Sequence, residues 1–204
     1  TGSIWIILGG IFSALEPFAF LAMVFFTIGM YRKGEKKHPN KIALFWTVGT
    51  AVVAFLGAGM LGLAHTFPGV NRYTHGTLVT AMHGHLAFWG AYAMIVLAII
   101  SYVMPNVTGR KLYNNARGHF AFWCANIGML GMTVAFGVAG VAQVYMERKM
   151  KMEFMEVQNE ISIHFVVLLL CATLFATGII LYIIEFLGYG KPTDEALVAA
   201  ESID

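Results

Sequence analysis

Long runs of apolar residues, separated by short polar segments, dominate the chain. Each run is longer than the roughly 20 residues that cross a bilayer as a helix. No polar segment between them is long enough to form a soluble domain. The pattern predicts an all-α membrane protein in which residues 1–204 form a single transmembrane bundle of five helices. The predicted helices cover residues 3–31, 42–66, 76–103, 118–146 and 161–188, followed by a loose tail at 189–204.

The composition supports this class. Hydrophobic residues make up 58% of the chain and charged residues only 12%, whereas a soluble domain carries about 25% charged residues. The mean hydropathy is +0.72. The formal net charge of +2 gives no sign of a nucleic-acid partner, and we expect none. Cys124 and Cys171 lie singly in apolar runs, so we interpret both as small buried hydrophobic residues.

Lysine and arginine are distributed unevenly among the connections. Residues 31–41 contain five of them against a single glutamate, and residues 104–117 contain three. The connection at 67–75 contains only Arg72. The positive-inside rule therefore predicts that 31–41, 104–117 and the tail lie in the cytoplasm, and that the other connections face outward.

Two histidines interrupt the third run, in Met82-His83-Gly84-His85-Leu86. Imidazole nitrogens in hydrocarbon need partners, because no water is available to satisfy them. Residues two apart on a helix point roughly 200° apart and differ by only about 3 Å in height. His83 and His85 are therefore predicted to face opposite sides of one helix at nearly the same depth.

This spacing favours two metal ions over one. Ligands that converge from one helix need i,i+3 or i,i+4 spacing. Here each side can hold its own metal, and neutral imidazole is a standard axial ligand of haem iron. Gly84 leaves room for a flat macrocycle close to the backbone. The alternative is that both histidines are hydrogen-bonded polar residues at a helix interface.

An ionisable carboxyl lies in the middle of the first run, in Ser13-Ala14-Leu15-Glu16-Pro17. Pro17 removes the hydrogen bond to the Ser13 carbonyl and is expected to kink the helix. Ser13 and Glu16 share one face at i,i+3 spacing. A carboxyl buried in a membrane indicates a proton relay or an ion site. The alternative is a protonated glutamate that hydrogen-bonds across helices.

Further polar residues gather between the second and third runs. Singly each is an ordinary interfacial residue, but together they offer the donors that haem carboxylates need. This group consists of His65, Asn71, Arg72, Thr74 and His75. The glycines of the second run are interpreted as positions where helices pack closely, and not as part of a reactive site. Residues 146–157 are predicted to extend the fourth helix outward as an amphipathic segment.

These motifs together resemble, in order and spacing, the large subunit of bacterial respiratory nitric oxide reductase, a member of the haem-copper oxidase superfamily. The similarity covers essentially the whole chain and corresponds to the last five of that subunit's twelve helices. The HGHLAF form is closer to the cytochrome c-dependent type. The matching segments are Ser13-Ala14-Leu15-Glu16-Pro17, His65-Thr66, Tyr73-Thr74-His75-Gly76-Thr77 and His83-Gly84-His85-Leu86-Ala87-Phe88.

The resemblance implies a set of cofactors. His83 is expected to be the proximal ligand of a high-spin haem b at the catalytic centre. His85 is expected to be one axial ligand of a low-spin haem b that supplies electrons. His75 is expected to lie near the haem propionates. The resemblance also implies a non-haem iron, and it leaves open whether a structural calcium is bound.

It also implies a reaction. Two NO molecules would be reduced to N2O and water with two electrons and two protons, the electrons coming from a membrane-anchored cytochrome c subunit in the bacterial inner membrane. Glu16 would shape the iron site and relay protons, with Ser13 and Thr66 as hydrogen-bonding neighbours.

The non-haem iron ligands of that family, an H-x3-E and an adjacent histidine pair, do not occur in this sequence. We therefore expect these ligands, and the second ligand of the low-spin haem, to come from an N-terminal part of the catalytic subunit outside this chain. Three alternatives remain. They are an oxygen-reducing haem-copper oxidase, a non-catalytic haem-binding membrane subunit and, with the least support, a transporter.

Overall fold

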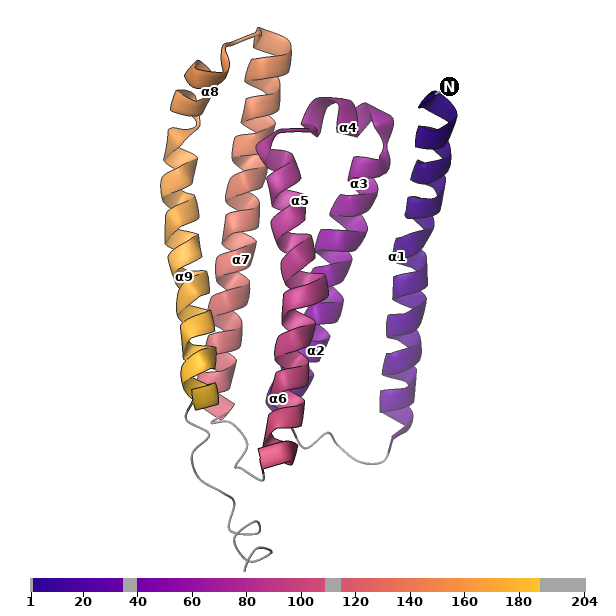
Figure 1. The fold of residues 1–204 in the computed structure, drawn as a ribbon, viewed down its shortest axis with the longest axis vertical. Coiled ribbons are helices and arrows are strands. Elements are labelled where there is room, and N and C mark those ends of the chain that lie inside the picture. Colours follow the sequence, from indigo (N-terminus) through magenta and orange to yellow (C-terminus); the bar gives the residue numbers. More distant parts are fainter. Residues whose placement is uncertain (1, 35–39, 109–114, 188–204) are drawn as a thin grey trace, which may run out of the picture.

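The computed structural model describes residues 2–34, 40–108 and 115–187, and all regular structure in these segments is helical. Five of the helical stretches are long and apolar enough to cross a membrane (Figure 1). They cover Ile7–Lys33, Lys41–Thr66, Leu78–Pro105, Ala116–Met150 and Ser162–Glu185. The predicted all-α membrane fold is confirmed. The predicted tail at 189–204 lies outside the described residues.

The first two spans have different internal structure. Helix α1 (Gly2–Lys33) continues through Pro17 as one α-helix. The second span begins as α2 (Lys41–Ala54), continues as the π-helical segment η1 (Phe55–Leu61) and ends as α3 (Gly62–Thr66). A π-helix pairs residues five apart, so it changes which faces of the span point toward its neighbours. The short helix α4 (Pro68–Thr74) then crosses that end of the bundle (Figure 1).

The remaining three spans form the other side of the bundle. The third span again contains a π-helical segment, and it consists of α5 (Leu78–Phe88), η2 (Trp89–Ala93) and α6 (Met94–Thr108). The fourth and fifth spans consist of α7 (Asn115–Val144), η3 (Tyr145–Met150) and α9 (Ser162–Leu187), with α8 (Phe154–Glu160) between them. Lys151 adopts a left-handed conformation, with φ of 61°. The fourth helix does extend beyond residue 146, but it ends at Met150 because of Lys151, so the predicted extension as far as residue 157 is wrong.

Helices α7 and α9 pack closely, because glycines bring their backbones into contact. A Cβ atom on Gly128 would lie 2.4 Å from the backbone nitrogen of Phe175, and one on Gly178 would lie 2.4 Å from that of Ala125. Small residues at such positions are typical of packed membrane helices. The core beside this pair is aromatic: Trp46 is fully buried and contacts Trp89 edge to face.

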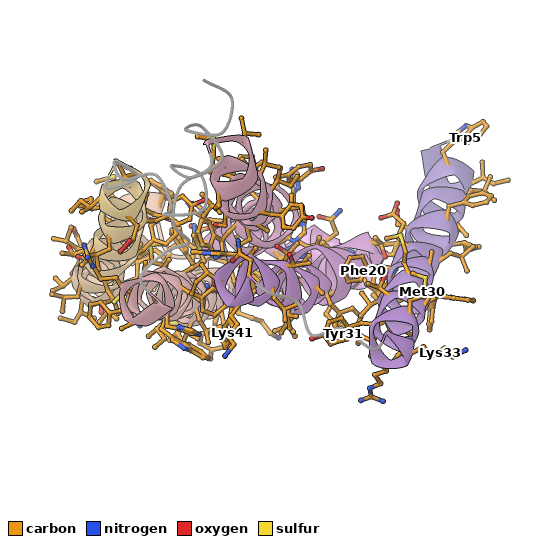
Figure 2. All side chains as sticks on the ribbon, turned by 90° about the horizontal axis from the view of Figure 1, so that it is seen from below. Trp5, Phe20, Met30, Tyr31, Lys33 and Lys41 are labelled. Carbon is orange, nitrogen blue, oxygen red and sulfur yellow. The ribbon has the colours of Figure 1, made fainter. Side chains whose placement is uncertain are left out.

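Helix α1 lies beside the bundle and leaves most of its surface exposed. Figure 2 shows Trp5 directed away from the other helices and Phe20 on the side that faces them. Its close contacts with the bundle are made mainly with η1 and α3. A Cβ atom on Gly10 would lie 3.3 Å from the carbonyl oxygen of Thr66, so α1 and α3 come close together here. The space between α1 and the third span is where the candidate site lies.

Candidate functional site

The helix that carries both histidines, α5, is anchored at its first turn. The Thr77 side chain caps it by accepting a hydrogen bond from the Val79 amide (3.3 Å). The Leu78 amide of the same turn is satisfied from another helix, because Gln143 of α7 accepts its hydrogen bond through Oε1 (2.9 Å). Gln143 is only 4% exposed. The start of α5 is therefore tied to α7 and does not depend on water to satisfy its amides.

His83 points from α5 toward the second span. Its Nδ1 lies 2.9 Å from the carbonyl oxygen of Gly57 in η1. Because a carbonyl can only accept, Nδ1 carries the hydrogen and Nε2 carries the lone pair. A Cβ atom on Gly62 would lie 3.3 Å from His83 Cε1, so the glycine makes room for the ring. Nε2 is therefore the nitrogen that remains for a metal.

A cavity of about 440 Å³ lies between His83 and α1. Glu16, Ser13 and Thr66 line it together with His83, so it collects four of the six site residues that the sequence predicts. The Thr66 hydroxyl donates a hydrogen bond to the Leu63 carbonyl (2.8 Å). Glu16 makes no hydrogen bond or ion pair with any described residue. Its side chain is exposed in this chain, whereas the sequence predicted burial, because α1 touches the bundle along only part of its surface.

His85 faces a different cavity. Its Nδ1 donates to the carbonyl oxygen of Ala81, four residues earlier in the same helix (2.8 Å), and its ring lies 4.8 Å from that of Phe136 on α7. The cavity is about 700 Å³ and is lined by residues of α5, η2, α6, α7 and α9. His83 and His85 therefore face separate spaces, as their spacing predicts, and each leaves Nε2 as the nitrogen with a lone pair.

The structure does not bring His75 to these cavities. It is exposed at the end of α4, where its backbone amide donates to the Asn71 carbonyl (2.9 Å). Asn71 and Arg72 are likewise exposed on α4.

His65 has a place that the sequence analysis missed. It was interpreted as a donor at the membrane surface, but its ring stacks on that of His83, with centroids 5.1 Å apart and planes inclined by 25°. The sequence carries no signal for this contact. It depends on how η1 rotates α3 relative to α5.

The donor set fits haem iron better than a protein-only metal site. Among the described residues, no three side chains of His, Cys, Asp or Glu are placed to hold one metal ion together. Instead, two single imidazoles line cavities of about 440 and 700 Å³, within the range of roughly 300–1,000 Å³ that bound ligands occupy. Fixing Nδ1 on a carbonyl sets the tautomer that a haem-ligating histidine needs. The residues present would therefore offer one imidazole ligand to a haem in each cavity.

Comparison with known proteins agrees with this geometry. Residues 1–174 match the family described as cytochrome c and quinol oxidase polypeptide I. The match covers most of the chain, so the chain belongs to this family of membrane oxidoreductases. It is also similar to a nitric oxide reductase subunit from Stutzerimonas stutzeri, with 42% identity over 197 residues. The aligned region is 93% of this chain and spans 42% of that relative's length.

Proposed function

We propose that this chain is the C-terminal part of the catalytic subunit of a nitric oxide reductase, which reduces two NO to N2O and water. The observation that carries the proposal is the placement of His83 and His85 on one helix, facing separate cavities, with Glu16 in the cavity of His83. The similarity to the nitric oxide reductase of Stutzerimonas stutzeri supports the choice of reaction.

In this proposal each histidine holds one haem b. His83 would hold the high-spin haem at the catalytic centre through Nε2, and His85 would supply one ligand of the low-spin haem. Bound haem iron supplies the redox chemistry and the site for NO. The Gly57 carbonyl keeps the His83 ring in the ligating tautomer through the 2.9 Å hydrogen bond to Nδ1. Because both ligands lie on α5, the chain itself fixes the distance between the two centres.

Glu16 is the proposed proton donor of the catalytic cavity. It lies near the middle of a membrane span and lines the same space as His83. In this role its carboxyl would pass a proton to the reacting molecules, and the hydroxyls of Ser13 and Thr66 provide further hydrogen-bonding positions along that wall. We propose that His75, at the end of α4, interacts with haem propionates.

The remaining components are proposed to lie outside this chain. The non-haem iron ligands and the second ligand of the low-spin haem would come from the N-terminal part of the catalytic subunit. A membrane-anchored cytochrome c subunit would deliver electrons. The charge distribution supports an orientation in the bacterial inner membrane in which the end with α4 and α8 faces outward.

Optical spectroscopy of the purified membrane complex tests the proposal. The reduced-minus-oxidised spectrum should show b-type haem, and carbon monoxide should perturb one fraction of it, because a five-coordinate haem binds CO and a six-coordinate haem does not. The complex should also consume NO with a reduced donor. A complex with no CO-reactive haem would exclude the catalytic role and leave a non-catalytic subunit.

A second candidate is oxygen reduction, which the description of the matching family favours. That reaction would require copper in place of the non-haem iron. Metal analysis of the same complex separates the two functions: iron beyond the haem content supports NO reduction, and stoichiometric copper supports oxygen reduction.

A further inference from the structure

The contact between His65 and His83 joins a residue of α3 to the proposed ligand of the catalytic haem. The two imidazole rings lie 5.1 Å apart between centroids and are inclined by only 25°. Flat rings at this separation form an offset stack. The stack links two histidines that lie 18 positions apart in the sequence, on two membrane spans.

The His65 ring is held from its own helix. Its Nδ1 donates a hydrogen bond to the Leu61 carbonyl oxygen (2.8 Å). Its Nε2 is buried and has no hydrogen-bond partner among the described residues. The position of the ring is therefore set by the Leu61 bond on one side and by the His83 face on the other.

His83 needs such a neighbour, because its remaining contacts leave one motion free. The outer torsion of a histidine side chain is broad, so rotamer preference alone does not fix the ring plane. The hydrogen bond from Nδ1 to the Gly57 carbonyl holds one edge of the ring, and Gly62 lies close to Cε1 but has no side chain that could hold the ring plane. A ring that is held at one nitrogen can still tilt about the hydrogen bond that this nitrogen makes. The flat face of His65 limits this tilt.

We propose that His65 is a positioning residue for the catalytic haem, which sets the plane of the His83 ring and so the orientation of the bond between Nε2 and iron. This inference rests on the proposed function, because it assumes that His83 binds a haem. It adds a residue of α3 to the set that determines the iron–histidine bond.

Resonance Raman spectroscopy of the ferrous complex tests this role through the iron–histidine stretching band of the high-spin haem. In the holoenzyme carrying His65→Leu, which fills space without a flat ring, the band should shift or broaden. His65→Phe retains a flat ring and should keep the wild-type band. Haem content, measured by pyridine haemochrome, should equal that of wild type in both variants.

His164→Leu is the matched control. His164 also bonds a carbonyl of its own chain segment through Nδ1 (3.1 Å to Ile161), but it lies on α9. This variant should leave the band unchanged. A wild-type band in His65→Leu would overturn the proposal, as would an equal shift in His65→Phe. A wild-type complex without any high-spin haem would instead overturn the proposed function, so the two failures are distinguishable.

Discussion

The two histidines of α5 are held in different ways, although they are separated by a single residue. His83 is fixed by tertiary contacts: its ring meets the Gly57 carbonyl of η1 and the His65 ring of α3. His85 is fixed mainly by its own helix, through the Ala81 carbonyl, with Phe136 of α7 at the ring. The first arrangement depends on the second span keeping its shape. The second arrangement exists wherever α5 is helical.

This difference suggests a division of roles within the site. The proposed ligand of the catalytic haem needs a fixed ring plane, because the geometry of the iron bond affects chemistry at that centre. The ligand of an electron carrier needs only the correct tautomer, which a bond to its own helix supplies. Substitutions in η1 or α3 should therefore alter the ring orientation of His83 more than that of His85.

The largest expected effect comes from removing either ligand. His83→Ala should abolish NO reduction and the CO-reactive haem, while the low-spin haem remains, because His85 keeps its own-helix bond. His85→Ala should remove the low-spin spectrum and leave CO binding in place. Optical spectra of the two purified variants test this expectation. Loss of the same haem in both variants would contradict separate sites.

A smaller effect is expected from Glu16→Gln, which keeps the shape of the side chain but removes the titrating carboxyl. Proton donation typically contributes roughly 10²–10⁴-fold to a rate, so steady-state NO reduction should fall by about that factor. Both haem spectra, and the rate at which the donor reduces the low-spin haem, should stay at wild-type values, because Glu16 lines only the His83 cavity.

The control for Glu16→Gln is Glu156→Gln, an exposed carboxyl on α8, which should leave the turnover rate unchanged. Equal losses in the two variants would mean that the general charge of the protein, and not the position of Glu16, determines the rate.

The smallest expected effect concerns how close η1 lies to α5. A Cβ atom on Gly57 would lie 2.5 Å from the Leu86 carbonyl carbon, so Gly57→Ala must push the two spans apart. Overpacking of this kind costs about 1–3 kcal/mol, and the midpoint of thermal unfolding should fall. The CO-binding spectrum should change with it, because the Gly57 carbonyl moves relative to His83.

Gly29→Ala provides the comparison for this substitution, because a Cβ atom there has no neighbour within 4 Å. Its unfolding midpoint should stay at or slightly above the wild-type value. If both variants unfold at the wild-type temperature, the close approach at Gly57 is not a constraint on the fold.

Much of the fold follows from the sequence alone. Apolar runs at 42–66 and 76–103 become spans that begin and end within two residues of those limits, at Lys41–Thr66 and Leu78–Pro105. The opposite orientation of His83 and His85 also follows, because helical rotation per residue is constant. The shared face of Ser13 and Glu16 is confirmed by their common cavity.

The parts that could not be predicted depend on departures from ideal helix. Nothing in Phe55–Leu61 distinguishes a π-helix from an α-helix, because both place apolar side chains in lipid. The sequence analysis therefore interpreted Gly57 as packing only, whereas its carbonyl also bonds His83. The same shift brings His65 onto the His83 ring. Contacts of this kind are decided by tertiary structure, and periodicity does not encode them.

The π-helical segment also makes the second span sensitive to how η1 is wound. If Phe55–Leu61 wound as an α-helix with no residue removed, everything beyond it would turn by about 100°, because a π-turn holds about one residue more than an α-turn. Trp46, on the α2 half, would stay among its aromatic neighbours, but His65 and Thr66 would swing away from the centre. Loss of the π-helical winding at unchanged length would thus leave a well-inserted protein whose two halves are out of phase.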